Sequence, residues 1–304
     1  MSFGTIAAEY DRLRSGPPEA AVEWLLPAAP SVVIDLGAGT GLLSRALARG
    51  APRVIAVEPD ERMAAVLRAR DPAIEVMQGR GEAIPLPEAS ADGVFISSAW
   101  HWMDPERAVP EIARVLRDGG RFGVIWTSRD QEVDWIRELN RLREPPGPVD
   151  HGRPRRREVT LPDGSPFGKA EIASFAFWRA MTISDTVAML GTYSGIITAS
   201  PRDREATLAR LRATLELWFP GADEIDVPMR SVCWRADRTG RQAPVTPLAA
   251  GRVSQRACRA WLWSPRRPCR AGGAGSRRGS SAWPARSAGG TRSPRRGLRE
   301  SGSP

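Results

Sequence analysis

The sequence predicts an α/β fold built on a mostly parallel sheet with helices on both faces. Short apolar runs rich in β-branched residues, such as residues 32–34 and 54–57, are typical of buried parallel strands. Segments with helical spacing alternate with these runs, as βαβ units require. A glycine-rich turn follows the first run, where such folds bring the backbone close to a ligand.

The glycine turn covers residues 35–41 and reads Asp-Leu-Gly-Ala-Gly-Thr-Gly. Its glycines alternate, whereas a dinucleotide-binding fingerprint requires G-x-G-x-x-G. The turn resembles motif I of the class I S-adenosylmethionine-dependent methyltransferases. The resemblance implies that the turn wraps the aminocarboxypropyl part of S-adenosyl-L-methionine, and that Asp35 holds its ammonium group directly or through water. The cofactor-binding residues implied in this turn are Asp35, Gly37, Ala38, Gly39, Thr40 and Gly41.

Ahead of the first strand, residues 8–18 resemble the lid segment Y-D-x-x-R-P-x-Y-P of small-molecule methyltransferases. Tyr10, Asp11, Arg14 and Pro18 match this pattern, and Pro17 stands where a second tyrosine is usual. The resemblance implies that Tyr10 and Arg14 contact the methyl acceptor. The alternative is a surface helix cap with an internally satisfied Tyr-Asp-Arg cluster. A helix over residues 19–26 follows, and we expect it to turn Ala20, Trp24 and either Val22 or Leu25 toward the core.

The second strand, residues 53–58, ends in an acid. A carboxylate at this position can accept both hydroxyls of a ribose, because it has two oxygens and the vicinal diol has two donors. Glu58 and the adjacent Pro59 are therefore candidate cofactor contacts. NAD enzymes and methyltransferases share this feature, so it predicts a nucleoside ligand without choosing between the two classes. A helix-capping or solvated Glu58 is the alternative.

The third strand, residues 74–77, leads into a loop that reads Gln-Gly-Arg-Gly-Glu-Ala-Ile-Pro-Leu-Pro. This loop resembles the G-D-A-E-x-L-P-F segment that flanks the adenine in the same methyltransferases. The resemblance implies that Gly81 offers its backbone N–H to the adenine ring and that Glu82 belongs to the cofactor site. Arg80 stands where an aspartate commonly accepts the adenine amino group, which puts that one contact in doubt.

The fourth strand, residues 92–97, is followed by a segment that resembles the A-W-H-W-x-D run of the type 11 methyltransferases. The resemblance places Ser97 beside the cofactor. His101 is the one histidine expected beside the pocket, and a histidine titrates near neutrality, so it is a candidate catalytic base. The alternative is that His101 orients the loop. One of Trp100 and Trp102 should line the pocket while the other joins the core, and we assign Trp100 to the acceptor.

The remaining elements follow from periodicity. We expect helices at residues 106–116, 133–142, 187–194 and 203–217, and strands at 121–126, 173–181 and 224–235. The complete expectation is a Rossmann-like methyltransferase sheet of seven strands, mostly parallel with an antiparallel last strand. Tyr193 lies in a segment expected to cover the pocket and is a further candidate acceptor contact.

The predicted organisation has four parts: an N-terminal lid and helix at 1–30, a cofactor-binding core at 31–130, a substrate-side half at 131–237 that completes the same domain, and a disordered tail at 238–304. The tail holds fifteen arginines and one acid, a charge of +14, so the rest of the chain carries −5 of the net +9. Its sparse aliphatic residues cannot offset the entropy of ordering.

These features predict in-line methyl transfer from S-adenosyl-L-methionine to a small-molecule acceptor. The alternatives are an NAD-type oxidoreductase, a nucleic-acid-associated methyltransferase or binder that uses the basic tail, and a catalytically impaired relative. DNA methyltransferases carry (N/D)-P-P-Y or Pro-Cys after the fourth strand, whereas residues 97–100 read Ser-Ser-Ala-Trp, so we expect no specific nucleic-acid partner. Three cysteines and two histidines indicate no metal site, and the absence of a long apolar run indicates a cytoplasmic protein without a membrane partner. The oligomeric state is left open.

Overall fold

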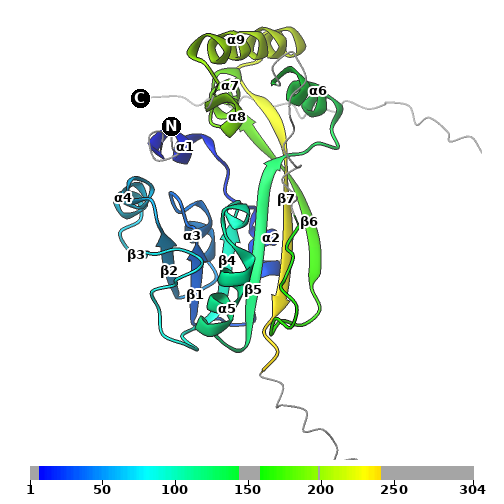
Figure 1. Cartoon of the computed structure of the whole chain (residues 1–304). Coiled ribbons are helices and arrows are strands. Elements are labelled where there is room, and N and C mark those ends of the chain that lie inside the picture. Colours follow the sequence, from blue (N-terminus) through cyan, green and yellow to red (C-terminus); the bar gives the residue numbers. More distant parts are fainter. Residues whose placement is uncertain (1–6, 144–157, 198, 241–304) are drawn as a thin grey trace, which may run out of the picture. The chain divides into compact units, whose positions relative to one another are not determined.

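A computed structural model describes residues 7–143, 158–197 and 199–240, and its centre is one sheet (Figure 1). Within these residues the strand order is β3-β2-β1-β4-β5-β7-β6. Neighbouring strands are parallel from β3 through β5, and β7 runs antiparallel to both β5 and β6. The predicted fold class is confirmed. The strands are β1 (Val32–Leu36), β2 (Arg53–Glu58), β3 (Glu75–Gln78), β4 (Ala91–Ser97), β5 (Leu116–Arg129), β6 (Glu171–Met181) and β7 (Ile225–Asp237).

Helices cover both faces of this sheet. Helix α5 packs its apolar side on one face, and α2 and α3 pack on the other. The described helices are α1 (Ala7–Leu13), α2 (Glu19–Leu25), α3 (Leu42–Leu47), α4 (Glu61–Arg70), α5 (Pro105–Val115), α6 (Asp134–Arg143), α7 (Ile183–Gly191), α8 (Ser194–Ile197) and α9 (Pro201–Trp218), with a 3₁₀ turn at Trp100–Trp102.

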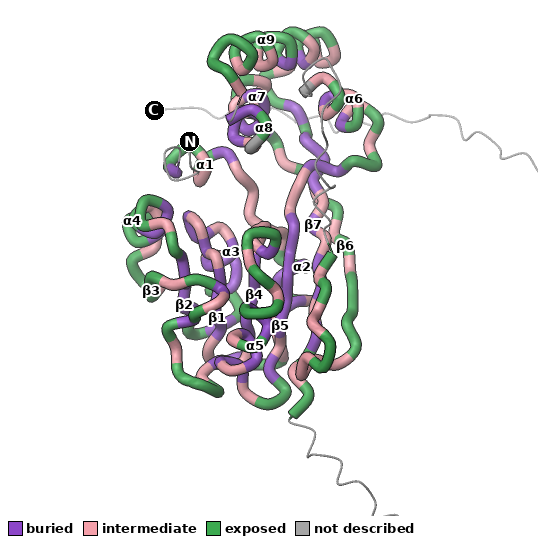
Figure 2. Tube along the Cα trace, in the orientation of Figure 1, coloured by how far each residue is buried: buried purple, intermediate pink, exposed green. Residues whose placement is uncertain are grey.

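Burial along the strands explains their sequence patterns. β1 lies between helices on both faces, so Val33, Ile34 and Leu36 are all fully buried and the strand shows no alternation. β6 forms the edge of the sheet, and its residues alternate between exposed and half-buried positions (Figure 2). The central strands thus hold the carboxyl-end loops on a rigid base.

A second apolar cluster lies beyond the ends of β6 and β7. Residues of α6, α7 and α9 pack there together with Leu13 of α1. We call α6, α7, α8 and α9 the cap; it lies at one end of the sheet, with α1 between the cap and α4 (Figure 1). The last turn of α1 is therefore part of the cap's core.

Two helices differ in detail from the sequence expectation. α2 buries Val22 and Leu25 and packs the half-buried Trp24 against the core, as predicted, whereas Ala20 is exposed and Ala21 is buried instead. α7 begins at Ile183 rather than 187, because the Thr182 side chain caps it by accepting a hydrogen bond from the Asp185 N–H at 3.0 Å. α7 also ends at Gly191, so Tyr193 lies after it, in the connection to α8.

Most of the predicted tail, residues 241–304, lies outside the described residues. The described start of the tail is anchored to the sheet: the Arg238 N–H donates to the Gly120 carbonyl at 2.7 Å, and the Arg238 carbonyl accepts from Gly119 at 3.0 Å. In the described parts of the chain we find no helix with the length and hydropathy needed to cross a membrane.

Gly41 begins α3 in the left-handed conformation (φ +86°), and a Cβ on it would lie 2.2 Å from Cδ1 of buried Leu67. We expect Gly41→Ala to lower the free energy of unfolding by about 2–5 kcal/mol, from backbone strain and overpacking together. Gly119 is the matched control, because it has φ +76° with open space around it. Gly119→Ala should cost only about 1–2 kcal/mol. Urea denaturation measures both, and equal losses would contradict the steric role of Gly41.

Candidate functional site

The glycine turn lies at the carboxyl end of β1, between β2 and β4. In the sheet, β2 lies on one side of β1 and β4 on the other, so the strand order reverses here. Open α/β sheets bind their ligands at such a point. Gly37, Gly39 and Gly41 have φ values of +72°, +58° and +86°. These values are ones that glycine adopts without strain. The Gly37 N–H donates to the Val57 carbonyl at 2.8 Å, which ties the turn to β2.

Glu58 ends β2 directly beside this turn and exposes only 6% of its surface. One carboxylate oxygen accepts the Gly39 N–H at 2.7 Å, and the other accepts the Asp60 N–H at 2.8 Å. Burial raises the pKa of Glu58, and the two backbone N–H groups oppose that rise. Each oxygen keeps a lone pair, so the carboxylate is oriented and can still accept a diol.

Asp35 is fully buried at the start of the turn. Its Oδ2 accepts the Ser44 hydroxyl at 2.6 Å, whereas no residue in the described part of the chain forms a hydrogen bond with its Oδ1. Burial raises the pKa of Asp35 to about 7, the Ser44 bond lowers it, and the charge of Glu58 adds to the rise. Thr40 has a similarly buried hydroxyl without a partner. Buried acceptors left unsatisfied are costly, so a cationic donor suits this end of the turn.

The loop after β3 lies against the segment after β4. A Cβ on Gly81 would be 2.6 Å from Sδ of Met103, and a Cβ on Gly37 would be 3.4 Å from the Met103 methyl. Glu82 accepts the Asp104 N–H at 2.9 Å. Gly81 and the glycine turn therefore both lie against Met103, a residue that the sequence argument missed because it occupies the variable position of the A-W-H-W-x-D pattern.

The segment after β4 separates the two tryptophans. Trp100 is 5% exposed and packs on Phe122 with ring centroids 5.5 Å apart, so it belongs to the core. Trp102 is 63% exposed, and His101, also exposed, lies beside it with ring centroids 5.0 Å apart. The assignment of Trp100 to the acceptor is therefore corrected: its ring is enclosed by the sheet core, and Trp102 is the tryptophan that presents surface.

Three predicted acceptor residues meet at the junction of α1 with the cap. The Arg14 guanidinium lies 3.8 Å from the Tyr193 ring centroid and 5.1 Å from that of Tyr10. Arg129, at the end of β5, also lies over Tyr193 at 4.9 Å. No sequence motif indicated Arg129, because its contact with Tyr193 arises only from the folded position of the cap. Trp100 is the one predicted acceptor residue outside this cluster.

A cavity of about 570 Å³ lies within the cap, between α7 and α9. Val187, Gly191 and Leu208 contribute apolar lining, while Arg204 and Glu205 are among its charged lining residues. None of the predicted cofactor residues lines it. The cofactor site inferred from the sequence and this cavity are therefore different places in the molecule.

Comparison with known proteins agrees with these motifs. A family model described as a methyltransferase domain matches residues 34–124. An uncharacterized methyltransferase of Mycobacterium tuberculosis is 39% identical over 240 residues, which cover 78% of this chain and 95% of the relative. An uncharacterized methyltransferase-like protein of Schizosaccharomyces pombe is 30% identical over 220 residues, covering 69% and 84% of the two chains.

Among solved structures, a proposed type II methyltransferase from Anaeromyxobacter dehalogenans matches 74% of this chain and 97% of its own, with a TM-score of 0.57 and 28% identity. The alignment with the mycobacterial relative spans nearly that whole protein, so the likeness is not restricted to the glycine turn. The chain therefore belongs to the methyltransferase family and has its Rossmann-like class I fold.

Proposed function

We propose that this methyltransferase uses S-adenosyl-L-methionine to methylate a small molecule. One observation carries the proposal: two carboxylates with complementary properties lie at the glycine turn. Among the described residues the buried Oδ1 of Asp35 has no donor, and the Glu58 carboxylate is oriented by two backbone N–H groups. Asp35 Oδ1 suits an ammonium group, and Glu58 suits a ribose diol. When bound, the cofactor supplies a methyl group already activated on a sulfonium.

The cofactor-side residues bind the parts of the cofactor and form the wall of its site. Glu58 receives the diol, Asp35 faces the ammonium group, and Gly81 offers a backbone N–H to the adenine. The rest of the turn, together with Pro59, Glu82 and Ser97, forms the surrounding wall. Met103 fills the space between Gly37 and Gly81, so it should set how closely the adenosine can approach.

The acceptor-side residues align the reacting atom and exclude water, which is the main contribution a protein makes to this displacement. Tyr10, Arg14 and Tyr193 contact the acceptor from the cap side, and Trp102 replaces Trp100 as the aromatic wall. His101, next to Trp102, removes a proton from the acceptor. The relatives reported above are all named as methyltransferases or methyltransferase-like, so the oxidoreductase and nucleic-acid alternatives gain no support.

Calorimetric titration of the full chain with S-adenosyl-L-methionine, and separately with NAD, tests the proposal. We expect one molecule of S-adenosyl-L-methionine to bind per chain, and the titration with NAD to give no saturable heat of binding. Binding of NAD without binding of S-adenosyl-L-methionine would overturn the proposal.

The raised pKa of Asp35 gives the cofactor site a pH dependence. An ammonium group favours the carboxylate, so protonation of Asp35 below about pH 7 should weaken binding. We expect the affinity for S-adenosylhomocysteine to rise roughly eightfold from pH 6.0 to pH 7.5 in the natural protein. Calorimetry across this range measures it.

Asp35→Asn is the matched variant, because it keeps the shape of the side chain and leaves the titration of the ligand unchanged. Its affinity should vary less with pH than that of the natural protein. The folded state binds the extra proton, so without ligand the natural protein should lose stability from about pH 4 to pH 7 relative to Asp35→Asn. Identical pH profiles for the two proteins would contradict a role of Asp35 in binding.

A further inference from the structure

Arg14 is a half-buried arginine whose guanidinium is fixed in place by the cap. Its Nε donates to the Thr192 hydroxyl at 2.9 Å, and its Nη2 donates to the Thr192 carbonyl at 3.2 Å. Its Cζ lies over the Tyr193 ring, 3.8 Å from the ring centroid, and 5.1 Å from the centroid of the Tyr10 ring. A guanidinium has five N–H donors, so these two bonds leave three donors for another acceptor.

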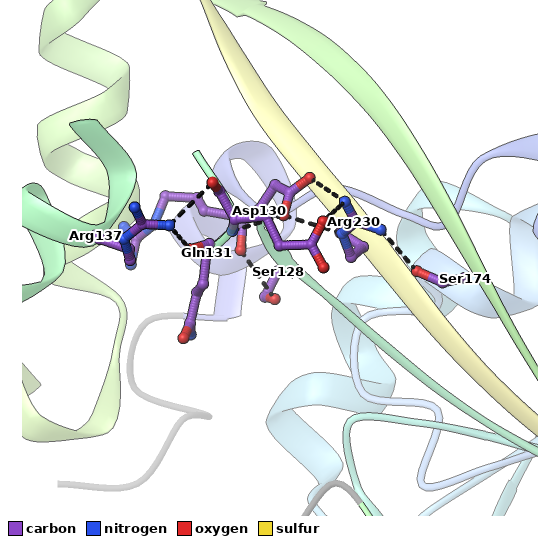
Figure 3. A network of polar contacts seen from close by, with 8 residues as sticks. Ser128, Asp130, Gln131, Arg137, Ser174 and Arg230 are labelled. Carbon is purple, nitrogen blue, oxygen red and sulfur yellow. Dashed lines mark hydrogen bonds and ion pairs between the residues drawn. The ribbon is translucent and has the colours of Figure 1, made fainter. Parts of the chain in front are cut away.

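The acids around Arg14 are engaged elsewhere. They pair with other arginines: Asp11 of α1 with Arg45 at 2.6 Å, Asp185 of α7 with Arg12 at 2.6 Å, and Asp130 at the end of β5 with Arg230 at 2.7 Å (Figure 3). Glu9, the remaining acid of α1, lines the cavity of the cap. Among the described residues Arg14 itself takes part in no ion pair.

Arg14 also lies on the cofactor side of the molecule. Two residues further on, a Cβ on Gly16 would be 3.2 Å from the Leu42 carbonyl, at the first turn of the helix that follows the glycine turn. β4 ends at Ser97, opposite Ile125, and β5 continues four residues to Arg129 beside Tyr193, a rise of about 13 Å. The Arg14–Tyr193 pair thus lies beyond the sheet edge that carries the turn, toward the cap.

We propose that the methyl acceptor carries an anionic group, a carboxylate or a phosphate, remote from the methylated atom, and that Arg14 binds this group. The inference rests on the proposed function, because it assigns the acceptor of that same site. A carboxylate or phosphate accepts two parallel N–H bonds from a guanidinium. The bonds to Thr192 and the contact with the Tyr193 ring fix the orientation of the Arg14 guanidinium, whose remaining N–H groups can then bind the anion. Among the described residues, no acid is paired with Arg14 and would have to be displaced first.

The test follows the Arg14 side-chain Nε–Hε signal by ¹⁵N nuclear magnetic resonance in the full chain saturated with S-adenosylhomocysteine. The probes are sodium acetate, inorganic phosphate and neutral acetamide. We expect acetate and phosphate to shift the signal saturably and acetamide to leave it unchanged. The tighter of the two anions indicates whether the natural group is a carboxylate or a phosphate.

Arg107 is the control for ordinary anion binding, since it is exposed on α5 and makes no ion pair in the described chain. The anion should bind at Arg14 about tenfold or more tightly than at Arg107, because hydrogen bonds to charged groups in an ordered site are worth a factor of that size. Arg107→Gln should leave binding at the Arg14 site unchanged. Arg14→Lys keeps the charge without the fork and should weaken it about tenfold.

Equal anion binding at Arg14 and Arg107, or no saturation at Arg14, would overturn the inference. The comparison within the natural protein does not depend on whether any variant folds. Binding of S-adenosylhomocysteine in the same samples separates the two claims: its failure counts against the proposed function, whereas its success without an anion site counts only against the role of Arg14.

Discussion

Glu58→Ala should weaken the binding of S-adenosylhomocysteine by about 10²- to 10⁴-fold. Both oxygens of the carboxylate are oriented by backbone N–H groups, so each is placed to accept one ribose hydroxyl. A hydrogen bond to a charged group contributes about 1.5–3 kcal/mol, and the variant loses two. It also frees the Gly39 N–H, which loosens the glycine turn. Calorimetric titration measures the change.

Two variants separate ribose binding from a loss of structure. Glu61→Ala removes an exposed acid three residues later, whose partner is Arg68, and should leave the affinity unchanged. Glu58→Gln keeps the volume but sets an amide N–H₂ against a backbone donor, so it should weaken binding nearly as much as alanine does. An affinity of Glu58→Ala within threefold of the natural protein would remove Glu58 from the cofactor site.

His101→Gln should lower kcat about 100-fold or more while changing KM little. Glutamine keeps much of the size of the side chain but cannot take up a proton, and a positioned base contributes about 10²- to 10⁴-fold. The profile of rate against pH should change as well, because the variant has no group at this position that can take up a proton. The measurement uses tritiated S-adenosyl-L-methionine and the first acceptor found in a screen of small anionic and neutral compounds.

His151, the chain's other histidine, supplies the matched control and lies outside the described residues. His151→Gln should leave kcat and the pH profile unchanged. If His101 orients the loop instead, His101→Gln should raise KM and keep the pH profile. Unchanged turnover of His101→Gln on its acceptor would exclude His101 as the base.

The strands were predictable because a strand that is buried on both faces has a continuous apolar sequence. Val33 and Ile34, or Ile55 and Val57, have no polar alternation, and the structure places them between two helical layers. Only Ala20 was misplaced on α2, because a seven-residue helix offers too few turns to define the edge of its buried face by periodicity. The start of α7 depended on the Thr182 cap, a local hydrogen bond that the apolar pattern does not record.

The two sides of the site differed in how far the sequence could predict them. Asp35 is the penultimate residue of β1 and Glu58 the last residue of β2, which is parallel to it, so topology alone brings them to one edge of the sheet. The acceptor side is built by contacts between distant segments, such as Arg14 with Thr192 and Arg129 with Tyr193. The burial of Trp100 and the exposure of Trp102 depend on how Phe122 of β5 packs, which no local pattern encodes.

A crystal structure of the full chain with S-adenosylhomocysteine tests the central claim most directly. We predict that the ribose hydroxyls lie within hydrogen-bond distance of both Glu58 carboxylate oxygens and that the ammonium group faces Oδ1 of Asp35. A ligand found away from the glycine turn, for example in the cavity between α7 and α9, would contradict the account.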